Sequence, residues 1–137
     1  MAKKPTSTEK AVKSPAKGSA KRILIIEDER PLAHALELKM KHEGYEVEVA
    51  YSGNEGLQKA LSGGFDLILL DLIMPEMDGF GVMAALQDKG QKTPIIVLSN
   101  LGQDEDRARA TTLGAKDYFV KANTPIAEIV SKVKSIL

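Results

Sequence analysis

The 137-residue sequence contains no cysteine, no tryptophan and only two histidines, His34 and His42. Without cysteine the chain has no disulfide framework, no thiolate nucleophile and no thiolate metal site. Two imidazoles also argue against an all-histidine zinc site. The unbroken apolar runs are four or five residues long, whereas a membrane span needs about 20. Chemistry in this protein must therefore come from carboxylates, hydroxyls and amines.

The formal net charge of zero hides two oppositely charged parts. Residues 1–22 carry seven Lys or Arg and one acid, a net of +6, whereas residues 23–137 carry 12 and 18, a net of −6. We expect residues 1–21 to form a flexible basic tail, because they contain almost no large apolar side chain. The tail has neither the apolar stretch of a secretory signal nor aromatic residues that stack on bases. We therefore predict a cytoplasmic protein with no membrane association and no specific nucleic-acid partner.

From residue 22 onward, short apolar runs alternate with amphipathic segments. Five runs predict strands, at residues 23–26, 47–50, 67–70, 95–98 and 118–120. Three of them are apolar without alternation, as in parallel strands that are buried on both faces. The order is strand then helix, five times, and right-handed crossovers would place helices on both faces of the sheet. The predicted fold class is α/β, a doubly wound five-stranded parallel sheet with five helices in three layers.

Turn and capping residues mark the ends of the predicted helices. Pro31 suits the first helical position of the first helix, and Gly44 suits its end. The second helix opens with a capping-box pattern, Ser52-Gly-Asn-Glu55, and Asp78 suits the cap of the third. The fourth is predicted at about residues 104–113, before Gly114, and Thr124-Pro125 opens the fifth.

Polar residues follow four of the predicted strands, at the sheet edge where ligands bind in open parallel sheets. The first strand leads into Glu27-Asp28-Glu29 and the third into Asp71. Like charges about 4 Å apart repel by roughly 4 kcal/mol at an effective dielectric near 20. A hard divalent cation with oxygen ligands would offset this repulsion, and Mg²⁺ matches the composition. Each acid taken alone is equally compatible with a solvated loop or a helix start.

Two further strand-end residues complete this predicted site. Ser99 ends the fourth strand and Lys121 follows the fifth. An ammonium beside the carboxylates adds a counter-charge and can hold an anionic phosphoryl group, and a hydroxyl can donate to a phosphoryl oxygen. Serine and lysine are each common at the ends of strands. Only their joint placement beside the acids indicates a phosphoryl-binding site.

These residues, in this order, resemble the receiver domain of two-component response regulators. The resemblance covers residues 22–137. It rests on Ile-Leu-Ile-Ile-Glu27-Asp28, Asp71-Leu-Ile-Met-Pro75-Glu-Met-Asp78-Gly79, Ile-Ile-Val-Leu-Ser99 and Asp-Tyr118-Phe-Val-Lys121. It implies a flavodoxin-like fold with strand order 2-1-3-4-5.

The resemblance also implies a function and its residues. Asp71 would accept a phosphoryl group from a sensor histidine kinase or a histidine phosphotransfer protein. Glu27, Asp28, Asp71 and the main-chain carbonyl of Ile73 would hold Mg²⁺, with Mn²⁺ as a substitute. The signalling residues would be Lys121, which pairs with the phosphoryl group, Ser99, which closes on it, and Tyr118, which turns inward when Ser99 moves.

On this reading the chain is a signalling domain and not an enzyme in its own right. Its output would be a downstream protein that binds the face formed by the fourth helix, the fifth strand and the fifth helix. The protein would be a monomer or a phosphorylation-dependent dimer. No DNA-binding or catalytic effector follows the fifth helix within these residues.

Several positions depart from the usual pattern of the family. Ala122 stands where proline is common after the lysine, so a cis peptide is not expected there. Asn100 stands where a smaller residue is common and would restrict access to the phosphoryl group. Ile73 and Leu101 cannot orient an attacking water, which predicts slow self-dephosphorylation.

Two other functions remain open on the sequence. An aspartate-nucleophile phosphatase of the haloacid-dehalogenase type would need a second Asp two residues after Asp71, where Ile73 stands. A degenerate receiver-like module that works by protein contact alone would not need the complete set of site residues that this chain has.

Overall fold

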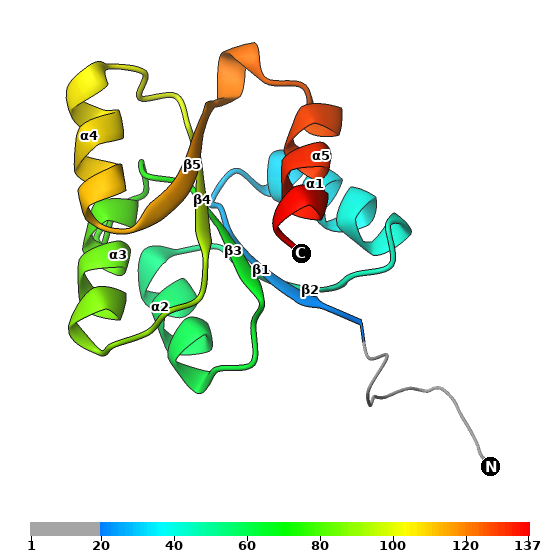
Figure 1. Ribbon diagram of the computed structural model, residues 1–137, viewed down its shortest axis with the longest axis horizontal. Helices are drawn as coiled ribbons and strands as arrows, with labels where there is room; N and C mark the ends of the chain where they lie inside the picture. Colours follow the sequence, from blue (N-terminus) through cyan, green and yellow to red (C-terminus); the bar gives the residue numbers. More distant parts are fainter. Residues whose placement is uncertain (1–19) are drawn as a thin grey trace.

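The computed structural model of the protein describes residues 20–137. The predicted tail over residues 1–21 therefore lies almost entirely outside the described residues. Strands and helices alternate along the chain (Figure 1). In chain order they are β1 (Arg22–Ile26), α1 (Arg30–His42), β2 (Glu46–Ala50), α2 (Gly53–Ser62), β3 (Leu67–Leu70), α3 (Gly79–Asp88), β4 (Ile95–Ser99), α4 (Asp104–Thr112), β5 (Ala115–Val120), a 3₁₀ turn (Lys121–Asn123) and α5 (Ile126–Ile136).

The five strands form one parallel sheet in the order β2-β1-β3-β4-β5. Helices α1 and α5 cover one face of the sheet, and α2, α3 and α4 cover the other (Figure 1). This arrangement confirms the predicted doubly wound sheet, its three layers and its strand order. The order reverses direction between β1 and β3, which leaves a crevice at the carboxyl ends of these strands.

The central strands are apolar throughout because each of their faces packs against a separate core. In β1, Leu24 and Ile26 face the core beneath α2, α3 and α4. Ile23 and Ile25 face the core beneath α1 and α5. All four side chains are at most 1% exposed. This double burial explains why the β1 sequence shows no polar alternation.

The predicted helix ends are largely confirmed. Gly44 follows α1 with a φ of +97°, a conformation that favours glycine. Ser52 Oγ accepts a hydrogen bond from the Glu55 amide at 3.1 Å, but the Glu55 carboxylate bonds the Tyr51 amide at 2.9 Å, one residue before the cap. Helix α1 begins at Arg30, so Pro31 occupies its second position. Within residues 20–137 no helix combines the length and apolar character that a membrane crossing requires.

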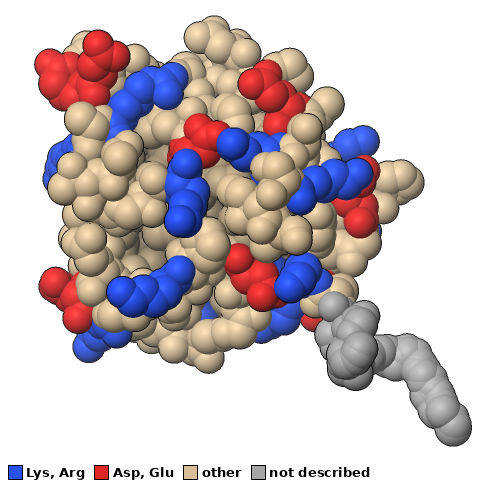
Figure 2. Space-filling model, viewed as in Figure 1, with Lys and Arg blue, Asp and Glu red and all other residues tan. Residues whose placement is uncertain are grey.

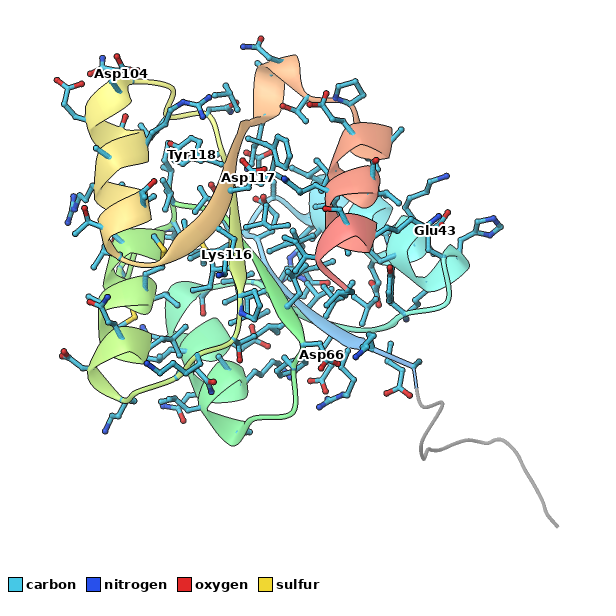
Figure 3. All side chains as sticks on the ribbon, viewed as in Figure 1. Glu43, Asp66, Asp104, Lys116, Asp117 and Tyr118 are labelled. Carbon is cyan, nitrogen blue, oxygen red and sulfur yellow. The ribbon has the colours of Figure 1, made fainter. Side chains whose placement is uncertain are left out.

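Strand β5 begins three residues earlier than the sequence predicts, at Ala115. Ile95 pairs with Ala115 and Ile96 with Asp117, so Lys116 is an extra residue in the ladder. The apolar pattern could not reveal this part of the strand, because Lys116 and Asp117 are charged and β5 is an edge strand. The bulge places Tyr118 toward α4 (Figure 3). Asp117 Oδ2 lies 3.0 Å from Lys132 Nζ of α5.

Helix α4 has the fewest buried residues of the five α-helices. Ala110 is its one buried residue, and its first turn carries Asp104, Glu105 and Asp106. Figure 2 shows these acids as a cluster at the upper left, over the start of α4, while charges of both signs are interspersed over the rest of this face. Few buried apolar contacts make an element easier to displace than its neighbours.

Candidate functional site

The carboxyl ends of three strands bring two acids and one lysine into contact. Glu27 directly follows β1, Asp71 follows β3 and Lys121 follows β5. Lys121 Nζ lies 2.8 Å from Glu27 Oε1 and 3.2 Å from Asp71 Oδ2. Glu27 and Asp71 are 2% and 3% exposed. Glu27 and Lys121, 94 positions apart in the chain, thus belong to one buried charge cluster with Asp71. The sequence predicts this proximity, because all three residues follow parallel strands.

Burial controls the protonation of this cluster. It raises the pKa of Glu27 to about 7, although hydrogen bonds from Lys121 and from the Glu29 amide act in the opposite direction. Burial likewise raises the pKa of Asp71, against the lowering effect of Lys121 and the Ile73 amide. Burial alone would lower the pKa of Lys121, but its contacts with Glu27 and Asp71 leave that pKa raised. The lysine therefore stays charged while the acids hold a proton more readily than usual.

The loop after β3 fixes the Asp71 side chain. The Ile73 amide donates a hydrogen bond to Asp71 Oδ1 at 3.2 Å, and the Gly79 amide donates to the Leu72 carbonyl at 3.0 Å. A Cβ at Gly79 would lie 2.4 Å from the Asp71 carbonyl oxygen. Asp78 caps α3 through the Gly81 amide at 2.9 Å, as predicted. Helix α3 can thus approach the strand end closely because its first residue has no side chain.

A magnesium-type donor set is present at this edge. Glu27, Asp28 and Asp71 each offer a carboxylate oxygen, and these oxygens lie within 4.8 Å of one another. Asp28 is half-buried, between the buried Glu27 and the surface. An all-oxygen set of acidic ligands is what Mg²⁺ and Mn²⁺ prefer, and zinc sites of nitrogen and sulfur have no counterpart here. The residues therefore fit the predicted metal.

Beside the acids lies a cavity of about 290 Å³. It is lined by Asp28, Glu29, Asp71, Ile73, Asn100 and Lys121. The Ile73 side chain is 52% exposed at this opening. Glu29, Ile73 and Asn100 are the exposed residues of this lining, so the cavity opens to solvent beside them.

Ser99 and Tyr118 lie beside this edge, and their side chains form hydrogen bonds with Leu101. Ser99 is fully buried, and its Oγ accepts a hydrogen bond from the Leu101 amide at 3.3 Å. Tyr118 points inward and is 7% exposed, and its hydroxyl donates to the Leu101 carbonyl. The loop after β4 therefore connects the two residues through Leu101.

Two contacts of the site were not predicted from the sequence. Glu29 reaches Lys121, with Oε2 3.4 Å from Nζ. Arg107 lies over the Tyr118 ring at 4.8 Å from its centroid. Glu29 directly follows the predicted ligands Glu27 and Asp28, which indicated that it lies near the site. No sequence pattern links Arg107 to Tyr118. The Lys121–Ala122 peptide is trans, as expected without proline.

These features define a flavodoxin-like α/β protein with a cluster of acids and one lysine at the carboxyl edge of its sheet. The family model of the response regulator receiver domain matches residues 23–134. The chain belongs to this family: it is the receiver domain of a two-component response regulator.

Individual relatives agree with this assignment. The chain is 40% identical over 116 residues to the response regulator ArlR of Staphylococcus saprophyticus, a match that covers 85% of this chain and 52% of that protein. ArlR of Staphylococcus aureus is 41% identical over 115 residues, 84% of this chain and 52% of that protein. The chain therefore spans about half the length of the curated relatives it matches.

Solved structures show the same fold. Chemotaxis protein CheY4 of Vibrio cholerae has a TM-score of 0.80 and 28% identity, with 87% of this chain and 100% of that chain covered. Response regulator TrrA of Thermotoga maritima, solved in complex with Mg²⁺-BeF, has a TM-score of 0.75 and 34% identity, with 85% and 99% covered.

Proposed function

We propose that this receiver domain is a phosphoacceptor switch with Asp71 as the acceptor. The observation that carries the proposal is the position of the buried Asp71 carboxylate, 3.2 Å from Lys121 and beside Glu27 and Asp28. An Asp71 oxygen attacks the phosphorus of a phosphohistidine on a sensor histidine kinase or a histidine phosphotransfer protein. The P–N bond breaks, its electron pair stays on the donor imidazole, and an acyl phosphate forms on Asp71.

The residues of the chain contribute mainly charge and position, which is what phosphoryl transfer requires. Glu27, Asp28, Asp71 and the main-chain carbonyl of Ile73 would hold Mg²⁺ or, in its place, Mn²⁺. When bound, the cation supplies positive charge beside the phosphoryl oxygens. Lys121 donates to a phosphoryl oxygen from the other side of the cavity, and the Ile73 amide keeps Asp71 oriented. The complex of TrrA with Mg²⁺-BeF supports this assignment by similarity.

The same site would change a binding surface. A phosphoryl group on Asp71 gives the Ser99 hydroxyl a new acceptor, and Leu101 links Ser99 to Tyr118. Moving the loop after β4 displaces α4, whose one buried residue is Ala110. The face of α4, β5 and α5 is thus the surface where we propose that a downstream protein binds or where a phosphorylated dimer forms. The domain acts as a cytoplasmic signalling module and catalyses only its own phosphorylation and dephosphorylation.

The test is phosphorylation by a small donor. Acetyl phosphate with Mg²⁺ is expected to add one phosphoryl group to the protein, as measured by intact mass. The Asp71→Asn variant should gain none, and removal of Mg²⁺ with a chelator should abolish the gain. A module that works only by contact would gain no mass, and a haloacid-dehalogenase-type phosphatase would release phosphate with steady turnover. Either result overturns the proposal.

A further inference from the structure

The ammonium of Lys121 has three N–H donors, and three carboxylates surround it. Nζ lies 2.8 Å from Glu27, 3.2 Å from Asp71 and 3.4 Å from Glu29. A phosphoryl oxygen that bonds Lys121 must therefore displace one of these carboxylates. The carboxylate that leaves determines how readily the lysine becomes available.

Of the three carboxylates, that of Glu29 is the most easily displaced from Lys121. Its side chain is 57% exposed, whereas those of Glu27 and Asp71 are 2% and 3% exposed. Its contact with Lys121 is also the longest of the three. An exposed ion pair is worth less than a buried one, because water and salt screen it. Glu29 also lines the cavity that an incoming phosphoryl group would enter.

The local structure gives the Glu29 carboxylate no other hydrogen bond in its helix. Glu29 is the N-cap of α1, a position where short side chains such as Asp or Ser commonly accept from the first helical amides. Here its side chain makes no capping hydrogen bond, and its own amide donates to Glu27 Oε2 at 3.0 Å. This hydrogen bond holds the backbone of Glu29 next to the Glu27 side chain. The carboxylate is thus held toward Lys121 and not toward the helix.

We propose that Glu29 is a positioning residue that competes with the phosphoryl group for Lys121. This inference rests on the proposed function and adds a residue that the ligand set and the acceptor do not include. Glu29 occupies the outermost donor of the ammonium and is displaced when the phosphoryl group reaches Asp71. It slows phosphorylation by small anionic donors, both through this contact and through its negative charge at the entrance.

The experiment compares Glu29→Gln and Glu29→Asp with the wild-type protein. Glutamine removes the charge, whereas aspartate keeps the charge on a side chain that is one methylene shorter and should not reach Nζ. Glu37→Gln is the matched control, because Glu37 lies on the same helix in an ion pair with Lys41, 2.9 Å away, and outside the cavity. Rates of mass gain with acetyl phosphate are measured at saturating Mg²⁺, at low and high ionic strength.

Both Glu29 variants should be phosphorylated about two- to fivefold faster than the wild type, the range of an exposed ion pair. The difference should shrink at high ionic strength. Their affinity for beryllofluoride, followed by NMR titration, should rise by a similar factor. Glu37→Gln should match the wild type in both measurements.

An acceleration in Glu29→Gln alone would overturn the competition for Lys121, because charge repulsion would then explain the result. Unchanged or slower phosphorylation in both variants would also overturn it. Wild-type protein that takes up no phosphoryl group would remove the proposed function together with this inference. If the wild type is phosphorylated and both Glu29 variants react at the wild-type rate, this inference alone is refuted.

Discussion

Lys121 Nζ and Glu27 Oε1 lie 2.8 Å apart at the carboxyl edge of the sheet, and both side chains are at most 9% exposed. Two buried carboxylates, Glu27 and Asp71, share this single ammonium. One positive charge cannot fully offset the negative charges of two buried carboxylates, so the cluster favours retention of a proton. The stability of the domain should consequently depend on pH.

We predict that the metal-free protein loses stability as the pH rises from about 4.5 to about 7. The pKa of Glu27 is about 7 in the folded state against 4.5 for the ordinary group. The unfolded chain ionises first, so the folded state binds more protons between these values and ionisation favours unfolding. Glu27 contributes to the loss of stability throughout this range. Urea denaturation at fixed ionic strength measures it.

Glu27→Gln is the control for this prediction, since it removes the titrating group. The difference in unfolding free energy between the variant and the wild type isolates Glu27 from acids such as Glu43, whose pKa is lowered by its hydrogen bond with Lys134. Adding Mg²⁺ at pH 7.5 should restore stability to the wild type, because the cation binds the folded state. A difference that stays constant from pH 4.5 to pH 7 would contradict the prediction.

Gly79→Ala should destabilise the domain by about 1–3 kcal/mol, the usual cost of a forced contact in a packed region. The new Cβ would lie 2.4 Å from the Asp71 carbonyl oxygen and 2.8 Å from Leu72 Cα, and neither backbone atom can move without disturbing the acceptor loop. Gly81→Ala is the matched control in the same helix. Its nearest contact is the flexible Met77 side chain at 3.2 Å, and alanine favours helix. Equal urea midpoints for the two variants would refute this account.

Arg107→Ala should loosen the inward position of Tyr118. Arg107 lies over the ring and donates to the Tyr118 carbonyl at 3.4 Å. An exposed cation–π contact contributes about 0.5–1 kcal/mol, enough to shift a rotamer population severalfold. NMR contacts between the Tyr118 ring and Leu101 should weaken in this variant. They should persist in Arg109→Ala, which removes an equivalent contact 4.0 Å from the Phe80 ring.

The sequence predicted the parts of the site that strand geometry determines. Glu27, Asp71 and Lys121 each follow an apolar run, and parallel strands bring their carboxyl ends to one edge whatever the rest of the chain does. The contacts of Glu29 and Arg107 were not predictable in this way. They depend on the direction that long, exposed side chains take, which no periodic pattern encodes.

The extent of β5 escaped prediction for a related reason. Ala115 and Asp117 pair with β4 on either side of the unpaired Lys116, and two of these three residues are charged. Pattern reasoning detects strands through buried side chains, so it detected only the segment around Tyr118. The inward position of Tyr118 follows from the bulge at Lys116, and a bulge has no signature in one sequence.

The acyl phosphate on Asp71 should be long-lived, because the Ile73 side chain offers no polar atom to the attacking water. Ile73 lines the cavity and is 52% exposed, so its side chain meets the path of that water. Ile73→Asn should speed dephosphorylation about tenfold, since one hydrogen bond made in the transition state contributes about 1–1.5 kcal/mol. Intact mass after removal of the donor gives the half-life. Ile73→Leu keeps the apolar surface and should match the wild type. A wild-type half-life of only seconds, or equal half-lives in Ile73→Asn and Ile73→Leu, would show that water reaches the phosphoryl group without help from this position.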